Sequence, residues 1–229
     1  MFSYLSRLIM VSALFAVVAR CQTPPDAAND QTNPPLSKHI FGIIPNFRTS
    51  DTFVLKDYKP LTPREKFRIA AQDSFDRGTV VLAAAFAGQG QLSNENRPYG
   101  QGVAGYSKYL GAAYADFVIG NYMTEGLFPT LLHQDPRYFR RGTGSGWSRL
   151  GDSMGQIFWT HGDSGRAQFN FSEVLGNSAA VGISTAYYAD NRSARDAGTQ
   201  LGIQLGVDMA TNVLKEFWPD AERKLKAKH

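Results

Sequence analysis

The sequence predicts an all-α protein, a bundle of about five to six helices packed through stripes of glycine, alanine and serine. Three observations predict this class. Apolar residues recur at helical spacing, helix start signals precede several of these segments, and no segment alternates apolar and polar residues over the length of a strand. Both a membrane-associated bundle and a compact soluble one fit the pattern.

The first 21 residues predict a secretion signal. Arg7 precedes an apolar run from Leu8 to Val18, which is too short to cross roughly 30 Å of hydrocarbon comfortably. Cleavage after Ala19 or after Cys21 fits the small-residue rule. Lipid attachment at Cys21 is the alternative, although a bulky Arg20 precedes it. We therefore expect an exported protein of the periplasm or outer membrane.

Composition predicts the domain organisation and limits the possible cross-links and partners. Residues 22–38 are rich in Pro, Asn, Asp and Gln and predict a disordered tether, followed by one helical domain over 39–222 and a basic tail over 223–229. The single cysteine excludes an internal disulfide. Loss of residues 1–21 removes two of the 24 basic residues and none of the 20 acidic ones, which lowers the net charge from +4 to +2. Nothing in this balance indicates a nucleic-acid partner.

Helix boundaries are marked most clearly at Thr62. Its side chain can cap a helix, Pro63 suits the first helical position, and Glu65 completes a capping box. The uncharged run after Gly78 is a continuation or a second short helix. Ser172 is expected to cap a later helix, and the last helix is expected to stop before a proline. The further helices are expected at roughly 102–132, with a break near Gly126 and Pro129, and at 146–160, 172–189 and 197–217.

Small residues at every fourth position form the most unusual pattern. Three glycines in one helix would cost on the order of 1 kcal/mol each relative to alanine unless close packing compensated. The preceding helix carries a matching stripe, so we expect two antiparallel neighbours with main chains in close contact, a glycine zipper. The expected packing residues are Gly176, Ala180, Ser184, Gly198, Gly202 and Gly206.

Small-residue faces are typical of membrane bundles, and aromatic residues lie near several helix ends. Charged residues interrupt the candidate spans, however: Lys108, Asp116 and Glu125 in one and Asp208 in the other. A buried ion pair between Lys108 and Asp116 or Asp208 would satisfy these charges.

The stretch "LLHQDPRYFRRGTGSG" holds the candidate binding residues. Arginine side chains beside flexible backbone amides could bind a phosphate or a lipid head group. Alternatively, the cations satisfy the carbonyls that end a helix, and the acid pairs with a neighbouring arginine. The residues concerned are His133, Asp135, Arg137, Arg140 and Arg141.

Other motifs predict no catalytic centre. The four histidines are scattered, which predicts no metal site, and no phosphate-binding loop motif occurs, so no cofactor is expected. "THGDSGRAQFNFSE" places His161, Asp163 and Ser164 in one segment, which we interpret as a turn. Phe217 and Trp218, followed by the basic tail, could contact a membrane or pack on the bundle.

Four segments carry a resemblance to a known group: "YGQGVAGYSKYLGAAYADFVIGNY", "LLHQDPRYFRRG", "FNFSEVLGNSAA" and "LKEFWPD". The chain resembles an uncharacterised family of exported bacterial cell-envelope proteins, a resemblance that implies no activity. It is also faintly similar to the type-2 phosphatidic acid phosphatases, because "SEVLGNSAAVGIS" opens a small-residue helix and Asp208 lies downstream. No histidine occupies either phosphatase motif, so the resemblance implies a scaffold without that active site.

These observations predict a non-catalytic helical-bundle protein of the cell envelope that packs with or binds a membrane, a lipid or a protein partner, including a second copy of itself. The alternative is a phosphatase-like enzyme acting on a phosphorylated lipid or related ester. It would use the arginines for phosphate and His133 or His161 for proton transfer.

Overall fold

A computed structural model describes residues 38–50, 58–188, 190 and 193–226. The predicted secretion signal, its cleavage and lipidation sites, the tether up to residue 37 and the last three residues of the tail lie outside the described residues. The predicted fold class is confirmed, because the described part is mostly helical with only short strands. It also confirms the predicted number of helices if the three segments from Gly102 to Leu131 are counted as one.

The helices are α2 (Pro63–Ser74), α3 (Arg77–Leu92), η3 (Arg97–Tyr99), α4 (Gly102–Asn121), the π-helix η4 (Tyr122–Leu127), α5 (Phe128–Leu131), α6 (Gly146–Gly155), α7 (Phe171–Ser184) and α8 (Ala194–Lys226). The strands are β1 (His39–Ile40), β2 (Ile44–Pro45), β3 (Thr49–Ser50), β4 (Tyr138–Phe139), β5 (Trp159–His161) and β6 (Ala167–Phe169).

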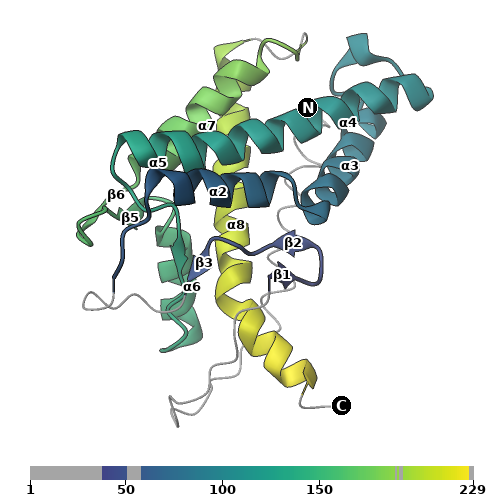
Figure 1. Ribbon diagram of the computed structural model, residues 1–229. Helices are drawn as coiled ribbons and strands as arrows, with labels where there is room; N and C mark the ends of the chain where they lie inside the picture. Colours follow the sequence, from purple (N-terminus) through teal and green to yellow (C-terminus); the bar gives the residue numbers. More distant parts are fainter. Residues whose placement is uncertain (1–37, 51–57, 189, 191–192, 227–229) are drawn as a thin grey trace.

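Two long elements cross one another and organise the molecule (Figure 1). Helix α4 continues through η4 into α5 as one rod, and α2 packs beside this rod, mainly against η4. Helix α8 runs across both, with α7 against its first half and α6 against its second half. The crossing region therefore collects side chains from α2, η4, α7 and α8.

The start of α2 confirms the capping prediction. The backbone N–H of Glu65 donates to the hydroxyl of Thr62, and the Glu65 carboxylate accepts from the backbone N–H of Thr62 at 2.8 Å. The apolar run after Gly78 belongs to a second helix, α3, whose first turn is capped by Asp76. Gly78 is required there, because a Cβ would lie 1.6 Å from the carbonyl oxygen of Ile43.

Two predicted helix ends are wrong. Asn170, not Ser172, caps α7, since its side chain accepts from the backbone N–H of Glu173, while Ser172 is buried in the first turn. Helix α8 continues through Pro219 to Lys226. There the carbonyl of Glu216 accepts from the guanidinium groups of Arg140 and Arg149, so backbone groups near the proline are satisfied by side chains.

Short strands were not expected, because segments of two or three residues are too short to show alternation. Strands β1 and β2 pair antiparallel, as do β5 and β6, which form the hairpin around the predicted turn at Asp163. Strand β3 pairs in parallel with β4, with Thr49 opposite Tyr138. This pairing joins the segment after His133 to the beginning of the domain.

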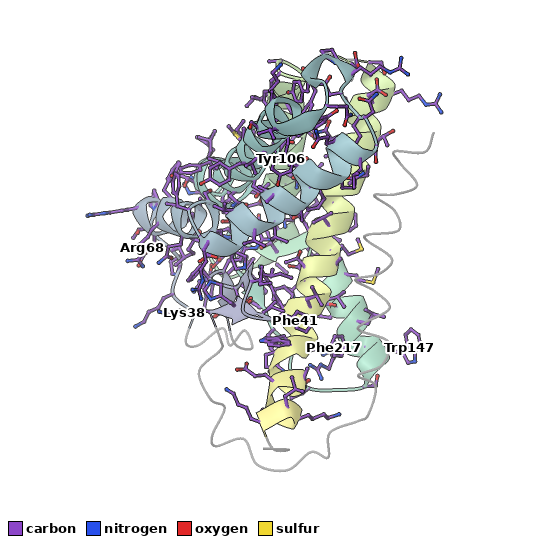
Figure 2. The ribbon with its side chains drawn as sticks, turned by 90° about the vertical axis from the view of Figure 1, so that its right-hand side faces the viewer. Lys38, Phe41, Arg68, Tyr106, Trp147 and Phe217 are labelled. Carbon is purple, nitrogen blue, oxygen red and sulfur yellow. The ribbon has the colours of Figure 1, made fainter. Side chains whose placement is uncertain are left out.

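The end of α8 is held by aromatic contacts (Figure 2). The ring of Phe217 lies under the guanidinium of Arg149, with the ring centre 4.6 Å from Cζ, and Trp218 contacts Phe41 at 4.4 Å between ring centres. Trp147, on α6, points away from the bundle and is 73% exposed. Phe217 and Trp218 thus pack on the domain.

The predicted glycine zipper is not found at three of its glycines. Helices α7 and α8 are antiparallel neighbours, but polar side chains join them: Asn177 donates to Asp208, and Gln200 to Ser184. A Cβ built at Gly198, Gly202 or Gly206 meets no atom within 4 Å. Gly198 and Gly202 are exposed, so this face of α8 is turned toward solvent and not toward α7.

Close main-chain approach occurs instead at Gly176. A Cβ there would lie 2.9 Å from Cγ2 of Thr124 and 3.1 Å from the carbonyl carbon of Met123. Helix α7 therefore approaches the π-helix most closely at Gly176, whereas Ser184, also buried, accepts from Gln200 of α8. No helix within the described ranges combines the length and apolar character needed to cross a bilayer.

Candidate ligand-binding site

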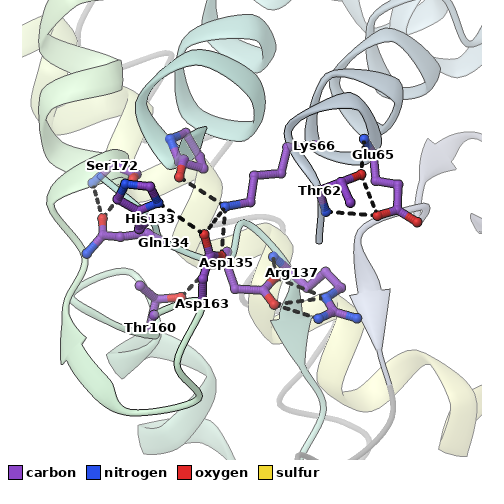
Figure 3. A network of polar contacts seen from close by, with 12 residues as sticks. Thr62, Glu65, Lys66, His133, Gln134, Asp135, Arg137, Thr160, Asp163 and Ser172 are labelled. Carbon is purple, nitrogen blue, oxygen red and sulfur yellow. Dashed lines mark hydrogen bonds and ion pairs between the residues drawn. The ribbon is translucent and has the colours of Figure 1, made fainter. Parts of the chain in front are cut away.

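Asp135 and Arg137, two of the predicted binding residues, bind each other (Figure 3). The Arg137 guanidinium donates to both carboxylate oxygens of Asp135, at 2.6 Å from Nη2 to Oδ2, and also to the carbonyl of Lys59. Tyr58 donates to the same carboxylate, and burial together with the negative charge of Asp135 raises the pKa of Tyr58. Asp135 itself is buried, so this pair fixes the segment in place.

Arg140 and Arg141 lie in a second group, where the chain enters α6. Arg140 is buried and donates to the carbonyl of Glu216 and to the carboxylate of Asp220 at 2.9 Å. The backbone N–H of Arg141 donates to the Glu216 carboxylate, and its exposed side chain reaches Asp152 at 3.9 Å. The donors of Arg137 and Arg140 thus already bind acids and carbonyls of the chain.

His133 lies apart from both groups. It has a positive φ of 54°, its side chain is 83% exposed, and Nδ1 lies 3.6 Å from the carboxylate of Asp163. The same carboxylate accepts from the buried ammonium of Lys66 at 2.8 Å. His161 contacts the ring of Phe139 at 5.2 Å, and burial lowers its pKa. The five predicted residues therefore do not converge on one site.

The predicted ion pair of Lys108 is wrong. Lys108 is exposed on α4, and the carboxylate of Asp116 accepts from the hydroxyls of Tyr187 and Tyr188 instead. This arrangement raises the pKa of Tyr187 through burial and the neighbouring carboxylate. Tyrosine donors satisfy the acid without burying a lysine.

The crossing of α2, η4, α7 and α8 holds a set of ionisable side chains that we call the charged cluster. Arg48 lies 3.3 Å from Glu125, and both side chains are more than 90% buried. Asp73 is hydrogen-bonded to Glu125, and Glu173 to Asp208, which also accepts from Asn177. Four acids thus surround two cations. The cluster consists of Arg48, Asp73, Glu125, Glu173, Asp208 and Lys215.

Local structure explains how these groups reach the interior. Glu125 lies in the π-helix, whose extra residue per turn changes the direction of side chains relative to α4 and is often found at functional sites. Arg48 precedes β3, which is fixed by pairing with β4. Lys215 comes from the middle of α8, two residues after the fully buried Val213.

Burial shifts the ionisation of several groups in the cluster toward their neutral forms. Burial raises the pKa of Glu125 well above its ordinary range, and burial together with Asp208 raises the pKa of Glu173 to about 8. Burial and the charge of Arg48 lower the pKa of Lys215 to about 8. One proton on each carboxyl pair leaves two carboxylates facing two cations. A charged ligand would disturb this balance.

A cavity of about 180 Å³ opens beside the cluster, between α3, α4 and α8. Five residues of the charged cluster line it, and apolar side chains provide most of its surface. The five are Arg48, Asp73, Glu125, Asp208 and Lys215. A second cavity of about 140 Å³ adjoins it and shares part of its wall, and Gln204 faces this second space. The apolar walls common to both are formed by Phe86, Phe117, Ile203 and Val207. We call the two spaces together the cavity.

Several polar atoms at the cavity lack partners within the described part of the chain. Oε1 of Gln204 is buried without a hydrogen-bond donor. Oδ1 of Asp73 and Oε2 of Glu125 are unsatisfied when both groups are ionised, and a proton on Glu125 satisfies this pair. No hydrogen bond or ion pair within 4.0 Å involves Nζ of Lys215 among these residues, although Lys215 is only 2% exposed. Buried polar groups of this kind generally bind a protein group, a water molecule or a ligand.

Comparison with known proteins does not assign this site. The chain matches no protein-family model, no curated protein and no solved structure. The site must therefore be interpreted from its own geometry.

Sequence reasoning missed the cluster because its members come from five separate segments and each resembles a surface charge. Two signals were present. Glu125 and Asp208 interrupt otherwise apolar helical stretches, which indicates buried charge. The partners Arg48, Asp73 and Lys215 carry no comparable signal.

Proposed function

We propose that this protein is a non-catalytic binding protein of the cell envelope that holds a small, uncharged, largely apolar molecule in the cavity. Its hydroxyl or carbonyl end lies at Lys215 and its apolar body between α3, α4 and α8. The observation that supports this most directly is a cavity lined largely by apolar surface and by the buried Lys215, whose amine has no hydrogen bond or ion pair among the described residues.

Size and charge support the same class of ligand. Each part of the cavity is comparable to a cavity of about 150 Å³ that accommodates benzene in another protein. A ligand of about six carbon atoms therefore fits one part. One proton on each carboxyl pair would balance the two cations of the cluster, so an uncharged head group would be bound without leaving a buried charge uncompensated.

Binding of 1-hexanol, measured by titration calorimetry, tests the proposal. Val207 lies in the wall shared by both parts, so Val207→Trp should fill the space and reduce affinity at least tenfold, which corresponds to about 1.4 kcal/mol. Val103→Trp, at a position that is 86% exposed on α4, is the matched control and should leave binding unchanged. Equal binding by both variants, or no binding of hexanol by the unmodified protein, contradicts the proposal.

A further inference from the structure

The environment of Lys215 restricts what its amine can do. Its side chain is 2% exposed and lines the cavity, and within the described part of the chain no ion pair or hydrogen bond holds its Nζ. A lysine that only stabilised the fold would be expected to bind a carboxylate directly, as Lys66 binds Asp163 at 2.8 Å. Lys215 instead has an amine available to the cavity.

Burial favours the neutral amine of Lys215. Arg48, from the segment before β3, lies near Lys215 and disfavours a second positive charge. Asp73 on α2, Glu125 on η4 and Asp208 on α8 act in the opposite sense, but burial is the largest effect, and the pKa is lowered to about 8. At pH 7 about one molecule in ten then carries a neutral amine, compared with fewer than one in a thousand for an ordinary lysine.

We propose that the ligand of the cavity carries an aldehyde or ketone group and that Lys215 binds it covalently and reversibly as an imine. This inference rests on the proposed function, since it requires the cavity to bind a molecule of that size. Burial and a neighbouring cation, here Arg48, are two features that activate a lysine toward carbonyl compounds.

The reaction balances with groups that are present. The lone pair of Nζ adds to the carbonyl carbon and forms the C–N bond, and a proton moves from nitrogen to oxygen to give a carbinolamine. The oxygen then leaves as water with both amine hydrogens, and the C=N bond forms. The hydrogen-bonded pair of Asp73 and Glu125 borders the same cavity, so it can supply a proton to the departing oxygen and a carboxylate opposite a protonated imine.

Hexanal and 1-hexanol form a matched pair of probes. The protein is incubated with hexanal and cyanoborohydride, and hexylated lysines are located by peptide mass spectrometry. At pH 7, hexylation of Lys215 should exceed that of Lys226, an exposed lysine on the same helix, by at least about tenfold, because more of its amine is neutral. Hexylation of Lys215 should increase between pH 6 and pH 8, and excess 1-hexanol should reduce it by competing for the cavity.

The outcomes separate the two proposals. Hexanol binding without preferential hexylation of Lys215 overturns the imine and leaves the proposed function intact. Absence of hexanol binding contradicts the proposed function itself. Lys215→Arg should lose the cavity-specific hexylation, whereas Lys226→Arg should retain both hexanol binding and hexylation of Lys215. If Lys215→Arg does not fold, hexanol competition at Lys215 in the unmodified protein still decides the question.

Discussion

Nε of Arg149 donates to Oε1 of Glu216 at 2.6 Å, and both side chains are more than 95% buried. Glu216 also accepts from the hydroxyl of Tyr138 and from the backbone N–H groups of Arg141 and Gly142. The Glu216 carboxylate thus connects α8 to β4, to α6 and to the segment between β4 and α6. This junction contains two of the arginines that the sequence suggested for phosphate binding.

Arg149→Met should destabilise the protein by about 3–5 kcal/mol, because it leaves the buried carboxylate of Glu216 without its cation. Urea denaturation measures the change. Lys226→Met removes an exposed ion pair with Glu222 and should change the free energy of unfolding by less than about 1 kcal/mol. Similar losses in the two variants would show that the Arg149 pair is not the element that holds α6 to α8.

Inorganic phosphate should not raise the melting temperature beyond the effect of chloride at equal ionic strength. The donors of Arg137 and Arg140 already bind Asp135, Asp220 and backbone carbonyls, so a phosphate would have to displace these partners. Differential scanning calorimetry tests this. A phosphate-specific increase that Arg137→Gln abolishes would restore the sequence-based hypothesis of a head-group site.

Local signals were sufficient to predict where helices occur, although not all of their ends, and were insufficient to predict the site. The capping box at Thr62 and Glu65 acts within one turn, so the sequence predicts it reliably. The cluster depends on Arg48, Glu125 and Lys215 meeting at a crossing of three separate elements, which no local pattern encodes. The glycines of α8 led to a prediction that was too specific. Their regular spacing shows that they share one face of the helix, but it does not show which element packs against that face.

Glu173→Gln should alter how stability depends on pH. The pKa of Glu173 is raised from 4.5 to about 8, so between these values the folded protein retains a proton that the unfolded chain has lost. Stability contributed by this group is therefore full below pH 4.5 and is lost as the pH rises toward 8. Each pKa unit of difference between the folded and unfolded protein corresponds to about 1.4 kcal/mol in the free energy of unfolding. Glutamine resembles the protonated acid and removes this dependence.

Urea denaturation at several values between pH 5 and pH 8 measures the effect as the difference between the unmodified protein and Glu173→Gln. The variant should gain relative stability as the pH rises. Glu222→Gln, on the surface of α8, is the control and should run parallel to the unmodified protein. Parallel curves for Glu173→Gln as well would mean that Glu173 is ionised in the folded protein.

Gly176→Ala and Gly202→Ala should change stability in opposite directions, although both glycines belong to the predicted small-residue stripes. A Cβ at Gly176 would press on Thr124 and on the main chain at Met123, where the π-helix cannot yield without moving Glu125, so a loss of about 1–3 kcal/mol is expected. A Cβ at Gly202 meets nothing within 4 Å, so the higher helix propensity of alanine should add up to about 1 kcal/mol. Thermal unfolding of the two variants measures both signs. Destabilisation by Gly202→Ala would show that this face of α8 is closely covered in solution, for example by a second copy of the chain, and that glycine is retained there for contact.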